Sequence, residues 1–162
     1  MNSKKTLFIT EAAVIAAIYV ALVLIFQSTS YGPIQFRVAE ALTVLPYFTP
    51  AAIPGVTIGC LISNLISPNV HILDIVFGTL ATFIAAILSY LLRRNKYLVP
   101  IPPIVVNAIA IPWVIRFASG EAQPILFLMM TVGAGQILAA GVLGLVLLFA
   151  LDKVKHVVFR NN

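Results

Sequence analysis

Two opposite charges, Arg37 and Glu40, lie three residues apart in the stretch YGPIQFRVAEALTVLP, which separates two strongly apolar segments. A charged group in apolar surroundings is costly unless it is paired and hydrogen-bonded. One interpretation is a mutual salt bridge, because residues at i and i+3 share a helix face. The other is a ligand site, in which the carboxylate accepts hydrogen bonds and the guanidinium donates them.

Three amides and a second carboxylate extend this polar set. Asn64, Asn107 and Gln136 each place an amide inside an apolar segment. An unpaired amide there costs a few kcal/mol, so each needs a partner. That partner is either another helix, in a bond worth about 0.6 to 2 kcal/mol, or a ligand. Asp74 either joins the site or only caps the helix that follows. Together these groups predict a ligand rich in both donors and acceptors.

Two ring side chains complete the candidate set. His71 and Trp113 are placed to stack on a planar ligand, although Trp is also a common anchor at the membrane interface. Cys60 is the only cysteine, so one chain can build neither a disulfide nor a thiolate metal site. No metal site and no cofactor are therefore predicted.

The composition is that of an integral membrane protein. Of the 162 residues, 61% are hydrophobic and 9% charged, and the mean hydropathy is +1.08. Such values lie far outside the range of soluble domains. Because a span needs roughly 20 residues, the chain has room for five or six crossings.

The basic residues decide between these counts. Eight of the ten Lys and Arg residues fall into three groups, at 4–5, 93–96 and 153–160. By the positive-inside rule, all three groups belong in the cytoplasm. We therefore predict an all-α membrane protein with both termini cytoplasmic and one transmembrane domain, 1–162, of six spans: 7–27, 36–48, 50–67, 70–92, 100–117 and 123–153. The net charge of +5 follows from this topology and indicates no nucleic-acid partner.

The second and third spans stay ambiguous. Pro46, Pro50 and Pro54 break this part of the chain, so residues 37–67 form either two short spans or a re-entrant hairpin. In both cases Arg37, Glu40 and Asp74 are expected near the outer ends of helices, where they would face a polar cup open to the outside.

Small residues form a second candidate surface. Ala13, Ala17 and Ala21 follow one another at four-residue spacing. Such a stripe lets another helix approach closely, either within the bundle or from a partner protein.

Several catalytic motifs are missing from the sequence. It contains no Gly-x-x-x-x-Gly-Lys phosphate loop, no His-Glu-x-x-His and no Gly-x-Ser-x-Gly. We therefore do not expect an enzyme. A stand-alone secondary transporter or channel for a small polar solute remains an alternative, and an intramembrane enzyme has less support.

The stretches IQFRVAEALTVLPYFTPAAIPGVTIGCLISNLISPN and LDIVFGTLATFIAAILSYLLRR resemble the queuosine-precursor transporter (QueT) family. Its members are substrate-binding S components of energy-coupling factor (ECF) transporters. The resemblance implies a six-helix S-component-like bundle in the bacterial plasma membrane, surrounded by lipid, with a binding site open to the outside. It also implies three partners: a transmembrane coupling protein (EcfT-like) and two ABC ATPases (EcfA-like). The alanine stripe resembles the surface with which S components dock.

The resemblance implies a 7-deazaguanine base, such as preQ1 or queuine, as the ligand. Glu40 or Asp74 would accept from the N–H groups on one edge of the base. The carbonyl would accept from one of four donors: Gln35, Arg37, Asn64 or Asn107. Family members usually carry Gly-Glu where this chain has Gly135-Gln136, and an acidic residue near Trp113. These departures weaken the expectation of a cationic aminomethyl base and leave room for a neutral one.

Overall fold

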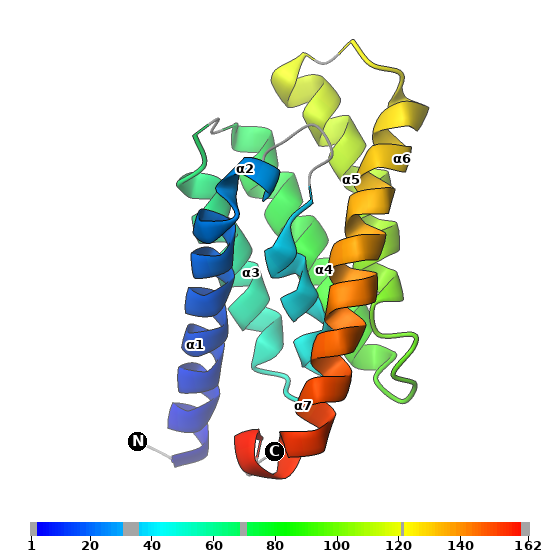
Figure 1. The fold of residues 1–162 in the computed structure, drawn as a ribbon. Coiled ribbons are helices and arrows are strands. Elements are labelled where there is room, and N and C mark those ends of the chain that lie inside the picture. The colour runs from blue at the N-terminus through cyan, green and yellow to red at the C-terminus, as the bar shows by residue number, and fades with distance from the viewer. Residues whose placement is uncertain (1–2, 31–35, 69–70, 121, 160–162) are drawn as a thin grey trace.

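The computed structural model describes residues 3–30, 36–68, 71–120 and 122–159, and every regular element in these ranges is helical. The elements in chain order are α1 (Ser3–Ile25), α2 (Gln27–Ser30), the 3₁₀ helix η1 (Val38–Tyr47), α3 (Ala52–Leu65), the π-helical turn η2 (Asp74–Gly78), α4 (Thr79–Leu91), α5 (Ile101–Ser119), α6 (Ile125–Gln136), the π-helical segment η3 (Ile137–Leu143) and α7 (Gly144–Val158). The all-α class expected from the sequence is confirmed for these residues. The elements α6, η3 and α7 follow one another without a break as one long helical stretch (Figure 1).

Among the described residues, four helical stretches are long and apolar enough to cross a membrane: Lys4–Ile25, Asp74–Leu91, Ile101–Ala118 and Ile125–Val157. The two other apolar helices, η1 and α3, have only 10 and 14 residues, fewer than the roughly 20 that span a bilayer as an α-helix. A membrane helical bundle is therefore supported, whereas the crossing of the membrane by η1 and α3 stays a prediction.

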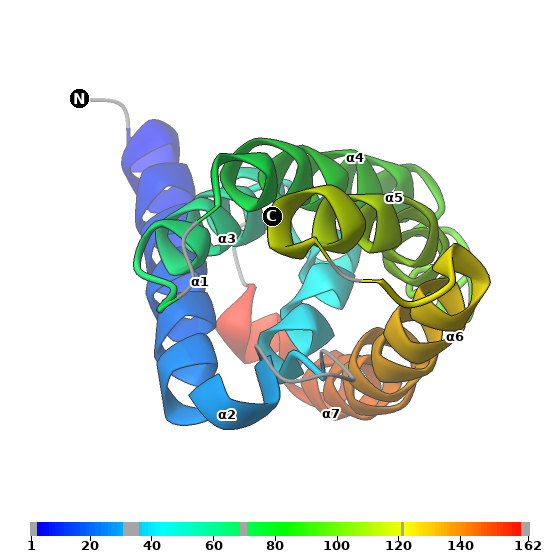
Figure 2. The same ribbon diagram turned by 90° about the horizontal axis from the view of Figure 1, so that it is seen from above.

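The short helix η1 forms the buried axis of the bundle. Its residues from Ala39 to Pro46 are all buried, and the other helices surround it (Figure 2). The chain descends along η1 and returns along α3 (Figure 1). At the reversal, the Thr49 hydroxyl accepts the Ala51 N–H at 3.2 Å and donates to Glu11 Oε2 at 2.7 Å. Pro54 lies in the first turn of α3, where its missing N–H removes no helix hydrogen bond.

Helices α1 and α3 pack closely because α3 carries two glycines at the contact. A Cβ atom at Gly55 would lie 2.9 Å from the Ile15 Cβ, and one at Gly59 would lie 2.7 Å from the Tyr19 Cβ. Real Cβ atoms essentially never come so close. The four-residue spacing of the glycines therefore sets the position of α1 against the core, a use of small residues that is common in membrane helices.

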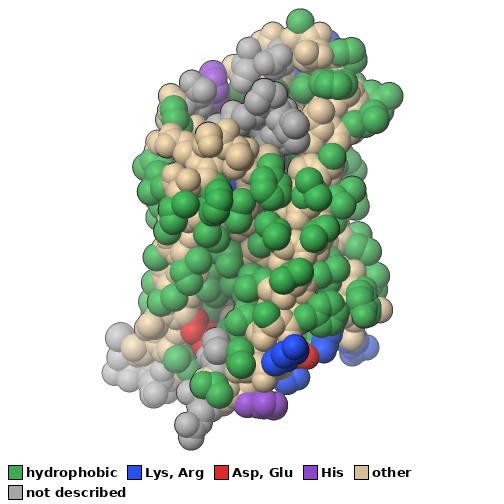
Figure 3. All heavy atoms as spheres, in the orientation of Figure 1, with side chains coloured by type: hydrophobic (Ala, Val, Ile, Leu, Met, Phe, Trp, Pro, Cys, Tyr) green, Lys and Arg blue, Asp and Glu red, His purple; other side chains and the backbone are tan. Residues whose placement is uncertain are grey.

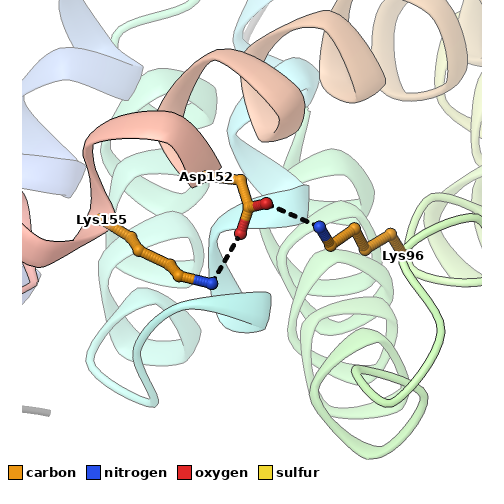
Figure 4. Close-up of polar contacts among 3 residues, drawn as sticks. All are labelled: Lys96, Asp152 and Lys155. Carbon is orange, nitrogen blue, oxygen red and sulfur yellow. Dashed lines mark hydrogen bonds and ion pairs between the residues drawn. The ribbon is translucent and has the colours of Figure 1, made fainter.

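Basic side chains gather at the end of the bundle where α1 begins and α7 ends, whereas apolar side chains cover most of the visible face (Figures 1 and 3). At this end Asp152 of α7 accepts from Lys96 Nζ at 2.6 Å and from Lys155 Nζ at 3.1 Å (Figure 4). The hydrogen bond to this carboxylate raises the pKa of Lys96. The loop between α4 and α5 is thereby tied to α7.

Candidate functional site

Glu40 lies in the first turn of η1, near the helix end as the sequence suggested, and its side chain is buried inside the bundle. Only 2% of its surface is exposed. Its Oε1 accepts a hydrogen bond from the Tyr19 hydroxyl at 2.6 Å, and its Oε2 accepts a longer one from Asn107 Nδ2 at 3.4 Å. One carboxylate on η1 therefore connects α1 and α5. Because η1 is buried along most of its length, the Glu40 carboxylate needs partners inside the bundle.

The structure does not place Arg37 and Glu40 on one helix face, which was one of the two interpretations of this pair. Arg37 precedes η1 with an extended backbone (φ −96°, ψ 98°), so the two residues do not share a helix face. The Arg37 carbonyl accepts the Glu40 N–H at 3.0 Å, which starts the helix. The two side chains nevertheless line one cavity.

This cavity brings four of the predicted site residues together. It has a volume of about 20 Å³ and is lined by Arg37, Glu40, Gly78, Thr82, Asn107, Ile111 and Gln136. A volume of this size holds about one water molecule. The lining combines a guanidinium, a carboxylate, two amides and a hydroxyl, which is a set able both to donate to and to accept from a polar ligand.

Gln136 has an unused acceptor in this cavity. The residue is 6% exposed, and its Oε1 has no hydrogen-bond partner among the described residues. A buried polar atom without a partner costs about 1 to 3 kcal/mol. This oxygen therefore offers a ready acceptor to the N–H group of a ligand.

Two of the lining residues lie at the ends of π-helical segments. Gly78 is the last residue of η2, and Gln136 immediately precedes η3. Wider turns of this kind are rare and are often found at functional sites. Here they occur on two elements that face the same cavity.

Asn64 and Asp74 are connected to each other and not to the cavity. Asn64 Nδ2 donates to the Asp74 carbonyl at 3.0 Å and contacts Cys60 Sγ at 3.6 Å. Asp74 begins η2, and the half-buried His71 lies just before it. The structure therefore gives Asn64 the role of an interhelical hydrogen bond, the alternative considered for each amide.

Trp113 lies on a different surface from the polar cavity. The residue is 46% exposed, and its ring stacks on that of Phe117 with centroids 6.3 Å apart. Both rings line an apolar groove of about 580 Å³ between α4 and α5. The last predicted site residue, Gln35, lies outside the described residues.

Sequence reasoning missed Tyr19 and Thr82. Tyr19 is fully buried. The Thr82 hydroxyl donates to the Gly78 carbonyl at 3.1 Å, and Cys60 Sγ lies 3.3 Å from the same hydroxyl oxygen. Tyr19 had a detectable signal, because a tyrosine in the middle of an apolar helix needs a partner for its hydroxyl. Thr82 had none, since threonine satisfies itself on the preceding turn of a helix.

Replacing Tyr19 with phenylalanine should destabilise the protein by about 1.5 to 3 kcal/mol, the range for a hydrogen bond to a charged group. The ring would still fill its place, so the loss reports the hydroxyl alone. Thermal unfolding in detergent measures it. Tyr97→Phe is the control, because Tyr97 is 66% exposed, and an equal loss in both variants would contradict the assignment.

Comparison with known proteins agrees with the resemblance found in the sequence. The family model described as QueT transporter matches residues 9–153. The chain belongs to the QueT transporter family. Every residue that lines the polar cavity falls inside the region matched by this family. The cavity is therefore built from the part of the chain that carries the family signature.

A curated relative is also similar over part of its length. The queuosine precursor transporter QueT of Lactococcus lactis subsp. cremoris (strain MG1363) is 42% identical over 94 residues, which are 57% of this chain and 54% of the relative. The match therefore spans about half the length of that relative. No solved structure matches the chain.

Proposed function

We propose that the chain is the substrate-binding S component of an ECF-type ABC importer and takes up a queuosine precursor, a 7-deazaguanine base. The observation that carries the proposal is the buried Glu40 carboxylate, surrounded by amide and guanidinium donors in a chain of the QueT transporter family. The partners proposed are an EcfT-like coupling protein and two EcfA-like ATPases. The protein itself supplies no catalytic group.

The base presents an N–H and an exocyclic amine beside a carbonyl. Glu40 would accept from the two nitrogen donors, while Arg37 or Asn107 would donate to the carbonyl. The unpartnered Gln136 Oε1 would accept a further N–H. We prefer Glu40 to Asp74 for the carboxylate because Glu40 lines the cavity and Asp74 does not.

Binding a base in this cavity requires the surrounding elements to move apart. Small-molecule sites usually measure about 300 to 1,000 Å³, against about 20 Å³ here. The Glu40 bonds to Tyr19 and Asn107 are the contacts that entry of the base must exchange. Because N–H groups of the base would take the place of Tyr19 and Asn107, the carboxylate would still be hydrogen-bonded while the cavity opens.

The proposed orientation places the basic end of the bundle in the cytoplasm, as the positive-inside rule requires. A cysteine introduced at Asn95, in the loop between α4 and α5, should then react with a membrane-permeant thiol reagent in intact cells and resist an impermeant one. Native Cys60 gives little background because it is fully buried. Labelling of Asn95→Cys by the impermeant reagent would contradict the orientation.

The alanine stripe is the proposed docking surface for the coupling protein. Ala13, Ala17 and Ala21 are exposed on α1, whereas Ala12 and Ala16 are buried inside the bundle. Replacing Ala17 with leucine should abolish uptake, because bulk at this position blocks close helix approach. Ligand binding by the isolated protein should change less than about twofold.

The matched control is Ala134→Leu. Ala134 is exposed on α6, on the opposite side of the bundle from α1 (Figure 2). Uptake by cells that express this variant should stay near the wild-type rate. If Ala17→Leu took up the solute at the same near-wild-type rate as Ala134→Leu, the alanine stripe would contact only lipid and not a partner protein.

Two measurements test the whole proposal. Mass spectrometry of small molecules retained by the purified protein should detect a 7-deazaguanine base. Affinity purification from the native membrane should recover ATPase subunits with the chain. A stand-alone secondary transporter would retain the base without the ATPases, and an intramembrane enzyme would return a chemically altered base.

A further inference from the structure

A second pocket, separate from the polar cavity, lies at the basic end of the bundle. Its volume is about 570 Å³, and it is lined by Tyr47, Phe48, Arg93, Arg94, Lys155, His156 and Phe159. These residues come from the end of η1, the turn after α4 and the last turns of α7 and beyond. No residue of this pocket lines the Glu40 cavity, so the proposed substrate site does not explain it.

The pocket carries a surplus of positive charge. Three of its lining side chains, Arg93, Arg94 and Lys155, are cations, and no carboxylate of a described residue lines it. Asp152 is shared between Lys96 and Lys155 (Figure 4), so one negative charge is divided between two cations.

The two arginines have no carboxylate partner in the described part of the chain. The Arg93 guanidinium lies 4.1 Å from the centre of the Tyr90 ring, a contact that orients the group without neutralising it. Arg94 is exposed and makes no ion pair with a described residue. Both guanidinium groups therefore keep their fork of donors for an anion, and phosphate is an anion that this fork binds well.

Apolar and aromatic surface adjoins the charged groups. The Phe48 and Phe159 rings stack with centroids 4.9 Å apart, and Tyr47 meets Phe48 edge to face at 4.7 Å. Just before Arg93, Leu91 is 66% exposed. Near Lys155, Val157 is 79% exposed. A ligand with an anionic head group and a long apolar chain could contact both the cationic side chains and the apolar surface beside them.

We propose that this basic pocket binds the phosphate group of an anionic phospholipid, with Arg93, Arg94 and Lys155 on the phosphate and the acyl chains along the exposed side chains of α4 and α7. Pockets of this kind, basic and at the end of a helix bundle, suit lipid head groups. A bound head group would connect η1, α4 and α7 at one point. The proposal does not depend on the identity of the transported solute.

Native mass spectrometry of the full-length protein tests the proposal, with phosphatidylglycerol and phosphatidylcholine of identical acyl chains as probes. The wild type should retain phosphatidylglycerol in preference to phosphatidylcholine. Each cation that contacts the bound head group contributes about fivefold to anionic-lipid binding. Arg94→Gln should therefore weaken retention about fivefold, and Arg93→Gln combined with Arg94→Gln roughly 25-fold.

Lys153→Gln is the matched control. Lys153 is exposed on α7 beside the pocket but does not line it, so its loss removes the same charge from the same end of the molecule. Retention of phosphatidylglycerol by Lys153→Gln should fall less than twofold relative to the wild type. Thermal unfolding of each variant verifies that the fold is intact.

A second arm distinguishes the source of the phosphate. Calorimetry measures the binding of inorganic phosphate to the protein in phosphatidylcholine nanodiscs. Arginine-dependent phosphate binding without a preference for phosphatidylglycerol would support the site but make a soluble phosphate compound its ligand. If neither probe binds, or if Lys153→Gln loses as much as Arg94→Gln, the proposal is overturned.

Discussion

Replacing Glu40 with glutamine is expected to weaken the affinity for a 7-deazaguanine base at least tenfold. The substitution exchanges one acceptor oxygen for a donor, so one N–H of the base would face another donor in a buried cavity. Breaking a buried, hydrogen-bonded charge interaction costs about 2 to 5 kcal/mol, and every 1.4 kcal/mol is about a factor of ten. Titration of the purified protein with the base measures the change.

The structure supplies a matched control for this experiment. Asp74→Asn makes the same chemical change in a carboxylate that does not line the cavity, and it should leave the affinity within about twofold of wild type. Glu40→Gln should keep its fold, because a glutamine oxygen still accepts from Tyr19 or Asn107. If Asp74→Asn lost affinity for the base while Glu40→Gln bound it fully, Asp74 and not Glu40 would be the acceptor.

Replacing Gly59 with valine is expected to produce the largest loss of stability, about 3 kcal/mol or more. The new Cβ would lie 2.7 Å from the Tyr19 Cβ, 2.9 Å from its Cγ and 3.1 Å from the Ala16 carbonyl oxygen. Overpacking of a core costs about 1 to 3 kcal/mol, and displacing Tyr19 also removes its hydrogen bond to Glu40, worth about 1.5 to 3 kcal/mol. Ligand affinity should fall together with stability, since the same tyrosine holds the carboxylate.

Gly133→Ala separates this effect from the general cost of losing a glycine. A Cβ at Gly133 would lie 3.6 Å from the Ala108 Cβ, which is ordinary van der Waals contact. Its unfolding temperature in detergent should stay close to wild type, and alanine also favours the helix. A Gly59→Val protein as stable as Gly133→Ala would show that α1 can move away from α3 without cost, contrary to the close packing of the two helices.

The hydropathy of the chain and the placement of its charges were enough to predict a helical membrane bundle and the approximate positions of its longer helices. The length of an apolar run indicates whether it can span the membrane, because the thickness of the bilayer sets the number of residues that a span needs. The sequence also identified the polar residues that were candidates for a site, since an amide or carboxylate in an apolar helix needs a hydrogen-bond partner. Four of them, Arg37, Glu40, Asn107 and Gln136, line the cavity.

Only the tertiary structure decided which polar groups meet. Helices that are apolar on every side give no sign of which face turns inward, because lipid is as apolar as the protein core. The rotation of each helix is then set by contacts such as those of Gly55 and Gly59 with α1, which bring Tyr19 to Glu40. The same rotations leave Trp113 on the outer surface and join Asn64 to the backbone of Asp74. Such contacts arise between residues far apart in the chain, and no local pattern encodes them.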